Sequence, residues 1–256
     1  MSHAATIEAL SVSERGTPAG EFASLEDNWA AAAAAIERTC GVRSGLKVLE
    51  AGGGSQTNVG FLPAPEFTAV DISAEQLDRN RWAHHRLLAN LETFEAYPDR
   101  YDAVVCSDVL EHLHRPEEAL RRLVPALAPG GLLIVGGPVP TSFKGLFTKA
   151  TPHAVHVWFY RAFLGYAQAG QPGHPPFPTV LSLAMGPRPL TRWARAHGLT
   201  PVHLGLSHPS WVIGRLREVS PLLSGTYVGA MAVLRALGLG AWRPDLTDMV
   251  LVFRKG

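Results

Sequence analysis

The sequence predicts an α/β fold in which a mostly parallel sheet of seven strands carries helices on both faces. Three observations lead to this prediction. Short apolar runs alternate with helical segments from residue 24 to about residue 137, and the first runs end in glycine or in an acid. The chain has 256 residues, which suits one large domain, and hydrophobic residues make up 46% of it, as in globular proteins.

The elements begin after residues 1–23, which mix small, polar and charged residues without periodicity and are expected to form a flexible tail. The folded domain is expected to span residues 24–256. Its first element is an Ala-rich helix over residues 24–40, which ends at Gly41 because glycine readily adopts the left-handed conformation common at that position.

Strands and helices then alternate up to residue 137. Ser73 and Gln76 have the spacing of a capping box and start a helix that continues to about residue 84. Pro116, followed by two glutamates, starts another, because proline and acids suit the first helical turn. The β-rich runs predict five strands, over residues 46–51, 67–72, 87–91, 101–107 and 132–136.

Residues 138–187 break this alternation. They are rich in proline and aromatic residues, and only Thr151 and Pro152 mark a clear helix start. We expect this segment to be an insertion that covers a substrate site. Regular elements then resume, as a helix over 189–197, a strand over 201–206, one or two helices within 210–239 and a last strand over 249–253.

Acidic and basic residues are distributed unevenly along the chain. No carboxylate occurs between Glu118 and Glu218, although the 99 intervening residues include ten Lys and Arg and six His. This stretch either meets an anionic partner, with Lys144, Lys149 and Arg161 as contacts, or is an apolar region whose cations are only solvated. Both interpretations stay open.

Composition also bears on location and partners. The N-terminus has no apolar run of signal-peptide type, and the uncharged stretch 219–234 is too short and polar to cross a bilayer. Two cysteines are too few for a disulfide scaffold. We therefore expect a cytoplasmic protein with no transmembrane anchor. Basic residues are not clustered, so nucleic acid is not expected as a partner.

A glycine-rich turn and an acid point to a nucleotide-type ligand. Gly52, Gly53 and Gly54 follow the first strand, where a sharp turn lets a ligand approach the backbone. Asp71 ends the second strand, 19 residues after Gly52, where a carboxylate can accept both hydroxyls of a ribose. A mere turn and a helix-end charge are the structural alternatives. Thr57 stands where a dinucleotide-binding loop has its third glycine, which disfavours a nicotinamide cofactor.

From about Ser24 to Gly137 the sequence resembles the class I S-adenosylmethionine-dependent methyltransferases. Five motifs carry the resemblance in the family's order, namely VLEAGGGSQ, AVDIS, ANLETF, YDAVVCSDVLEHL and LAPGGLLIVGGP. The resemblance implies a Rossmann-like fold and S-adenosyl-L-methionine as cofactor. Gln56 stands where the family often has a further glycine and Asn90 where it often has Asp, so these two positions bear on how tightly the donor binds.

The resemblance also implies roles for individual residues. Asp71 would hold the ribose, Ile72 would pack on the adenine, and Asn90 would lie near the adenine amino group. The implied cofactor-binding residues are Glu50, Gly52, Gly53, Gly54, Asp71, Ile72, Asn90, Leu91 and Ser107. Beyond Gly137, the segments FKGLFTKATPH, HVWFYR and PFPTVL resemble a subgroup that modifies natural products or lipid-linked molecules. A small-molecule acceptor of this kind, amphipathic or anionic, and a role in secondary metabolism are therefore expected.

Methyl transfer to a neutral hydroxyl or amine needs a base that removes the acceptor's proton. Glu111 and His112 in the fourth motif are candidates, with Asp108 beside them. His153, His156 and Tyr160 are others, because their spacing of i, i+3 and i+7 places them on one helix face. His112 is slightly favoured, since the end of the fourth strand faces the donor's methyl group in this fold. A structural role is the alternative for each.

No metal site is expected, because His112 and His114 lack the spacing of helical metal ligands and have no Cys nearby. The sequence thus predicts an enzyme that methylates a small molecule by direct in-line transfer. A catalytically inactive sensor or scaffold that binds the donor is one alternative. A nicotinamide-dependent oxidoreductase on a similar sheet is a second.

Overall fold

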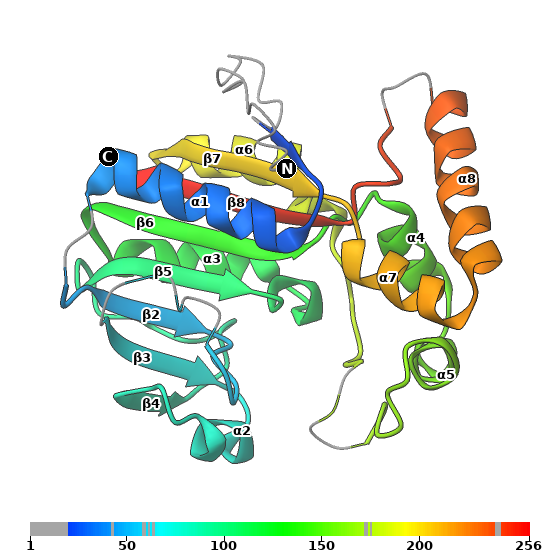
Figure 1. Ribbon diagram of the computed structural model, residues 1–256. Helices are drawn as coiled ribbons and strands as arrows, with labels where there is room; N and C mark the ends of the chain where they lie inside the picture. Colours follow the sequence, from blue (N-terminus) through cyan, green and yellow to red (C-terminus); the bar gives the residue numbers. More distant parts are fainter. Residues whose placement is uncertain are drawn as a thin grey trace.

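The structure, a computed structural model, describes residues 20–41, 44–57, 60, 62, 65–171, 174, 176–238 and 242–256. A single sheet of eight strands forms its centre, in the order β1-β7-β8-β6-β5-β2-β3-β4 (Figure 1). β8 is antiparallel to both of its neighbours, β6 and β7, and all other neighbouring pairs are parallel. The strands are β1 (Gly20–Phe22), β2 (Lys47–Ala51), β3 (Glu66–Asp71), β4 (His85–Leu88), β5 (Tyr101–Ser107), β6 (Leu127–Pro138), β7 (Leu199–Ser207) and β8 (Asp248–Lys255).

The predicted α/β class is confirmed, but the sheet has one strand more than the seven expected. The additional strand, β1, lies in the segment predicted to be a tail, and it pairs with residues 205–207 of β7. Three residues are too few to show the alternation of apolar and polar residues that marks a strand in a sequence. These residues become a strand because β7 offers them a free edge. The rest of the predicted tail, residues 1–19, lies outside the described residues.

Helices cover both faces of the sheet, with α1 on one face and α3 and α6 on the other (Figure 1). α1 begins after Ser24, whose hydroxyl accepts a hydrogen bond from the Asp27 N–H, and α2 begins after Ser73 in the same way. The helices are α1 (Leu25–Cys40), α2 (Ala74–Arg79), α3 (Pro116–Leu123), α4 (Phe143–Ala150), α5 (His153–Phe163), α6 (Pro187–Ala196), α7 (Ser210–Val219) and α8 (Pro221–Leu237).

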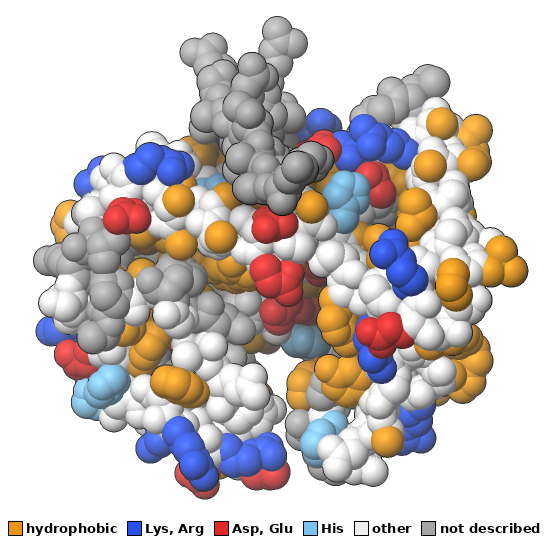
Figure 2. All heavy atoms as spheres, viewed as in Figure 1, with side chains coloured by type: hydrophobic (Ala, Val, Ile, Leu, Met, Phe, Trp, Pro, Cys, Tyr) orange, Lys and Arg blue, Asp and Glu red, His pale blue; other side chains and the backbone are white. Residues whose placement is uncertain are grey.

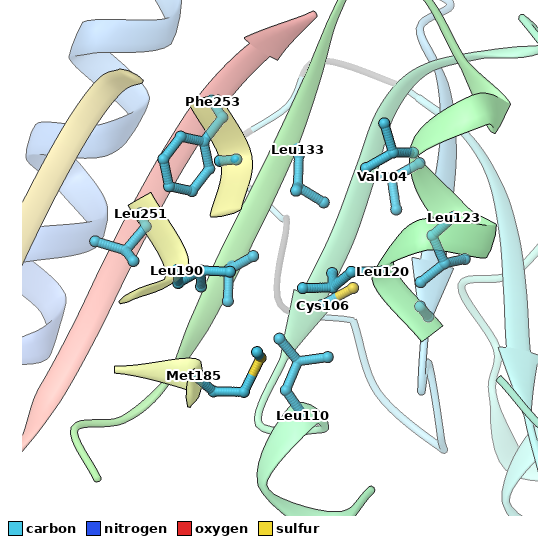
Figure 3. Close-up of a cluster of buried hydrophobic side chains, with 14 of the residues drawn as sticks. Val104, Cys106, Leu110, Leu120, Leu123, Leu133, Met185, Leu190, Leu251 and Phe253 are labelled. Carbon is cyan, nitrogen blue, oxygen red and sulfur yellow. The ribbon is translucent and has the colours of Figure 1, made fainter. Parts of the chain in front are cut away.

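The larger apolar cluster lies between the sheet and the helices α3 and α6. Figure 3 shows side chains of β5, β6 and β8 facing side chains of these helices in one continuous layer. Its labelled members include Val104, Leu133, Leu251 and Phe253 from the strands, and Leu120, Leu123 and Leu190 from the helices. This layer fixes the positions of the strand ends.

A buried polar contact anchors α1 on the opposite face. His203 Nε2 of β7 lies 2.8 Å from Asn28 Oδ1 of α1, so this nitrogen carries the proton. Burial, helped by the charge of Arg38, lowers the pKa of His203 to about 4, and the ring is neutral. Gly205 lies beneath the pair, since a Cβ at that position would stand 1.9 Å from Asn28 Oδ1.

Several predicted boundaries need correction. β4 comprises residues 85–88 rather than 87–91, and α2 ends at Arg79 rather than near residue 84. Thr151 does not cap α5. Its hydroxyl donates to the Phe147 carbonyl and so satisfies the end of α4, a helix that the sequence did not predict.

The helices α4, α5, α7 and α8 gather beyond the strand ends, on the side to which β2, β3 and β5 point (Figure 1). The cover is therefore larger than the predicted segment 138–187, because α7 and α8 belong to it. Figure 2 shows a hollow between the sheet and this cover, with acidic side chains in it. Within the described part of the chain, no helix is both long and apolar enough to cross a membrane.

Candidate functional site

The glycine-rich turn after β2 is shaped by its neighbours. The N–H groups of Gly52 and Gly53 both donate to the Val70 carbonyl, at 2.7 and 3.1 Å. Gly52 has a φ of +74°, and a Cβ there would stand 1.8 Å from Val109 Cγ2. The missing side chain therefore lets the turn pack against the segment that follows β5. This contact brings the first and fourth motifs together.

Asp71, at the end of β3, closes the same turn. Its two carboxylate oxygens accept hydrogen bonds from the N–H groups of Gly54, at 3.0 Å, and Ser73, at 2.8 Å. Each carboxylate oxygen retains a lone pair that can accept a ribose hydroxyl. The next side chain, Ile72, is apolar and yet 73% exposed, so its surface is available to pack against a nucleobase such as adenine. These residues fit a nucleoside ligand.

Asn80 holds the glycine turn in place through its side chain, a role that the sequence analysis did not predict. Its buried side-chain amide donates to the carbonyls of Gly53 and Gly54, at 2.9 and 3.2 Å. Its oxygen accepts from the N–H groups of Trp82 and Ala83, both at 3.0 Å. The amide thus joins segments 26 and 27 residues apart in the chain, and no local pattern signals such a contact.

The other predicted donor residues differ in accessibility. Asn90 is exposed, and its side-chain oxygen accepts from the Glu92 N–H at 2.9 Å. Leu91 is buried in the core, so only its backbone can line a site. Glu50 and Ser107 are buried at the ends of β2 and β5, and the Ser107 hydroxyl donates to Asp108 Oδ2 at 3.2 Å.

Two acids follow β5. Glu111 is buried, and this burial, together with the charge of Asp108, raises its pKa to about 8. Asp108 is surrounded by protein atoms although solvent reaches it, and burial raises its pKa too. A Cβ on Gly137 would stand 3.6 Å from Glu111 Oε2, an ordinary contact distance, so this oxygen lies beside the Gly137 backbone at the end of β6. At neutral pH the Glu111 carboxyl is therefore largely protonated, with a pKa suited to proton transfer.

His112 lies beside this acid. Its Nδ1 is 2.7 Å from the Pro178 carbonyl, so Nδ1 carries the proton and Nε2 can accept one. Nε2 lies 3.9 Å from Glu111 Oε1. The Glu111 carbonyl in turn accepts from Val180 and Leu181. The cover thus holds the end of the fourth motif in place.

The three basic residues predicted to contact an anion are engaged within the molecule. Lys144 Nζ lies 2.9 Å from Asp248 Oδ1, and Arg161 donates to the Ala169 carbonyl at 2.7 Å. Lys149 Nζ lies 3.5 Å from the Leu181 carbonyl. These contacts weaken the interpretation of the three residues as partners of an anion.

The helix face predicted on α5 is only partly coupled to the acids. The Thr151 hydroxyl donates to the Phe147 carbonyl, so His156 Nε2, 2.7 Å away, donates to the Thr151 oxygen. The His153 ring lies edge-on to His156, and its buried Nδ1 has no hydrogen-bond partner among the described residues. Tyr160 differs, because the charges of Lys144, Asp248 and Asp108 all act on it, and burial raises its pKa.

A cavity of about 420 Å³ lies where α7 and α8 meet the segments flanking β7 and β8. This volume falls in the range of about 300–1,000 Å³ typical of small-molecule sites. Most of its wall is apolar, and Tyr227, His208, Arg235 and Asp245 add polar groups. The charges of Lys144 and Asp248 act on Tyr227, so this ion pair lies within electrostatic range of the cavity wall. No group of three or more metal-ligating side chains occurs among the residues that the structure describes.

Comparisons with known proteins match the part of the chain that forms the glycine turn. A family model described as a methyltransferase domain matches residues 49–133, which contain the glycine turn, Asp71 and the acids after β5. A curated protein of Synechococcus sp., described as uncharacterized, is 33% identical over 100 residues, which cover 34% of this chain. The chain spans only 24% of that relative's length.

Solved structures with less than 25% identity to this chain share its fold. An S-adenosylmethionine-dependent methyltransferase of Mesorhizobium loti has a TM-score of 0.51 and 16% identity, over 89% of this chain and 97% of that one. Phosphoethanolamine N-methyltransferase 2 of Haemonchus contortus, solved with S-adenosyl-L-methionine, has a TM-score of 0.50 and 13% identity, over 93% and 53%. The cyclase SpnF has a TM-score of 0.52 and 17% identity, over 91% and 84%.

Proposed function

Since this chain belongs to the class I S-adenosylmethionine-dependent methyltransferases, we propose that it methylates a small amphipathic molecule, with Glu111 as the proton acceptor. The expected family, enzyme class and cofactor, S-adenosyl-L-methionine, are confirmed. The acceptor and the residue roles are the proposal. The observation that carries it is a buried carboxyl of raised pKa, held beside the glycine turn by the contact of Gly52 with Val109.

For the residues that would bind the donor, the proposal keeps the roles expected from the sequence. The turn at Gly52 and Gly54 would receive the methionine part, Asp71 would accept the ribose hydroxyls, and Ile72 would pack on the adenine. Asn90 and the Ser107 backbone would complete the contacts. When bound, S-adenosyl-L-methionine supplies an electrophilic methyl group, so the protein's tasks are to orient the acceptor, exclude water and remove a proton.

Glu111 suits the last task better than His112. A base with a pKa near the working pH combines a useful ionised fraction with proton affinity. Glu111 Oε2 lies beside the Gly137 backbone at the end of β6, whereas His112 Nδ1 is hydrogen-bonded to the Pro178 carbonyl. His112 would act through Glu111, by lying 3.9 Å from its other oxygen. Tyr160 is the further candidate, because its charge environment includes Asp108.

The acceptor would occupy the cavity between α7 and α8 and extend toward the strand ends. Val228 and Met231 of α8 offer an apolar wall, and Tyr227 and Arg235 offer polar contacts. A natural product or lipid-linked molecule with an apolar part and a polar or anionic group fits this lining. The cover, residues 138–187 with α7 and α8, would shield the reacting atoms from water.

Two experiments test the proposal. Titration calorimetry should show binding of S-adenosyl-L-methionine and of its demethylated product, and no binding of a nicotinamide dinucleotide. Release of the demethylated product should then be measured over a panel of amphipathic hydroxyl, amine and carboxylate compounds. Binding of the donor without turnover on any of them would favour the sensor or scaffold, and binding of the dinucleotide alone would favour the oxidoreductase.

Fold likeness by itself does not settle the activity, because one protein of similar fold is described as a cyclase. The acids after β5 are what favour proton removal during methyl transfer here. The expected cytoplasmic location and role in secondary metabolism stay predictions.

A further inference from the structure

The outward face of α8 is apolar along its whole length. Leu222, Val233 and Leu237 are 77%, 59% and 73% exposed, and their spacing of 11 and 4 residues places them on one side of the helix. Thr226, Gly229, Ala230 and Ala236 are exposed between them. A solvated helix normally turns charged residues outward, and α8 has the reverse arrangement. At 1.5 Å per residue this face is about 25 Å long.

The charge and position of α8 fit a membrane surface rather than water. Its one charged residue, Arg235, lies on the inner side, 3.7 Å from Asp245. α8 packs chiefly on α7, and Figure 2 shows hydrophobic side chains along the outer edge of the molecule, where Figure 1 places α8. Such an extent of exposed apolar surface is uncommon on a soluble monomer and marks an interaction site.

The neighbouring helix adds a cation. α7 carries an exposed Arg217 near its end, whereas its Trp211, six residues earlier and so on another side of the helix, packs edge-on to Tyr166 with ring centroids 6.0 Å apart. The only acid of the pair, Glu218, is bonded to Arg215. A long apolar face beside an exposed arginine, with no unpaired acid among the described residues of these two helices, suits a surface that contains anionic lipid, because each cation near such a surface is attracted to it.

We propose that the outward face of α8, with Arg217 of α7, docks on the surface of a bilayer that contains anionic lipid. A bilayer surface accepts an apolar helix face without a shaped partner, and this face is smooth because small residues separate its larger side chains. The inner side of α8 lines the cavity through Val228 and Met231. Docking would therefore bring the cavity close to the lipid. The docking proposal does not depend on the proposed catalytic activity.

Vesicle co-sedimentation of the full chain tests this proposal. The protein is mixed with vesicles of phosphatidylcholine alone or with phosphatidylglycerol added. We expect stronger binding to the vesicles with phosphatidylglycerol, and a loss of about tenfold or more in the variant Leu222→Glu/Val233→Glu. Arg217→Glu should lower binding to the anionic vesicles by about fivefold or more and leave binding to phosphatidylcholine nearly unchanged.

Matched controls separate docking from damage to the fold. Tyr97→Glu replaces an equally exposed apolar side chain on the loop between β4 and β5, and should bind vesicles as the wild type does. Thermal melting and affinity for S-adenosyl-L-methionine should be unchanged in all variants. Wild-type protein that ignores both kinds of vesicle, or a double variant that binds normally, overturns the proposal. A wild-type dimer that Leu222→Glu/Val233→Glu converts to a monomer, without vesicle binding, assigns the face to a second copy instead.

Discussion

Replacing Glu111 by Gln should stabilise the protein increasingly as the pH rises. The folded state holds the Glu111 carboxyl in its neutral form up to a pKa of about 8, whereas the unfolded chain releases this proton near pH 4.3. Between these values the folded state binds more protons than the unfolded state does, so the free energy of unfolding of the wild type falls as pH rises. Above about pH 8 this loss is complete. Gln has a similar shape and does not titrate.

The magnitude follows from the same pKa values. Between about pH 5.5 and about pH 8.5 the free energy of unfolding of the wild type should fall by up to about 3 kcal/mol, because it changes by 1.36 kcal/mol per pH unit between the two pKa values. Local relaxation around the buried charge reduces this loss of unfolding free energy, so a loss of about 1.5–3 kcal/mol is expected. For a chain of this size 1 kcal/mol corresponds to about 2–4 °C, so the Tm advantage of Glu111→Gln should grow by about 3–12 °C over this range.

Differential scanning calorimetry at both pH values measures this effect. Glu95→Gln is the matched control, because Glu95 is 90% exposed and its removal should leave the pH dependence unchanged. A Tm difference between Glu111→Gln and the wild type that is the same at both pH values would refute the reasoning, since the carboxyl would then not be held neutral by the fold.

Four further predictions follow from the site and its supports. The apparent kcat/KM should rise with pH through a pKa of about 8 and lose this dependence in Glu111→Gln, because a base acts when deprotonated; a rise that Glu111→Gln retains would point to another base instead. Asp71→Ala should weaken binding of S-adenosyl-L-methionine at least about tenfold in calorimetry, through loss of charge-assisted bonds, and unchanged affinity in a folded variant would remove Asp71 from the site. Asn80→Ala should lower the free energy of unfolding in urea by about 2–4 kcal/mol, because it strands two carbonyls and two N–H groups, whereas the exposed Asn90→Ala should cost under about 1 kcal/mol; equal losses would contradict the support assigned to Asn80. Gly205→Ala should destabilise the protein by about 1–3 kcal/mol through its clash with Asn28 Oδ1, and Asn28→Ala in the same chain should recover part of that loss; purely additive effects would exclude the clash.

Elements with strong local signals were predictable from the sequence. β5 matches its predicted range because YDAVVCS contains the apolar run AVVC, and α1 begins where Ser24 provides a cap. α4 escaped prediction because it is short and contains Gly145, which lies too close to the Val139 and Pro140 carbonyls for a side chain. β1 escaped because its pairing depends on β7.

The same distinction holds for the site. Gly52 and Asp71 were identified because a turn and an acid at a strand end have a recognisable spacing. The raised pKa of Glu111 depends on burial, and the chain beside it includes Val180 and Leu181, about 70 residues further along. Asn80 likewise acts on a turn distant in the sequence. Properties that arise from contacts between remote segments leave no local pattern to read.

The place of β8 in the sheet has a consequence for how this chain comes to its folded state. β8, the last strand among the residues that the structure describes, lies between β6 and β7, and its residues 251–253 are fully buried. Until those residues have been synthesised, β6 and β7 have no strand to join them, and their edges stay open to wrong partners. The N-terminal part of the sheet can assemble earlier, but the whole sheet closes only after β8 has been synthesised. Removing residues 248–256 would therefore leave two half-sheets with exposed edges rather than a slightly shortened protein.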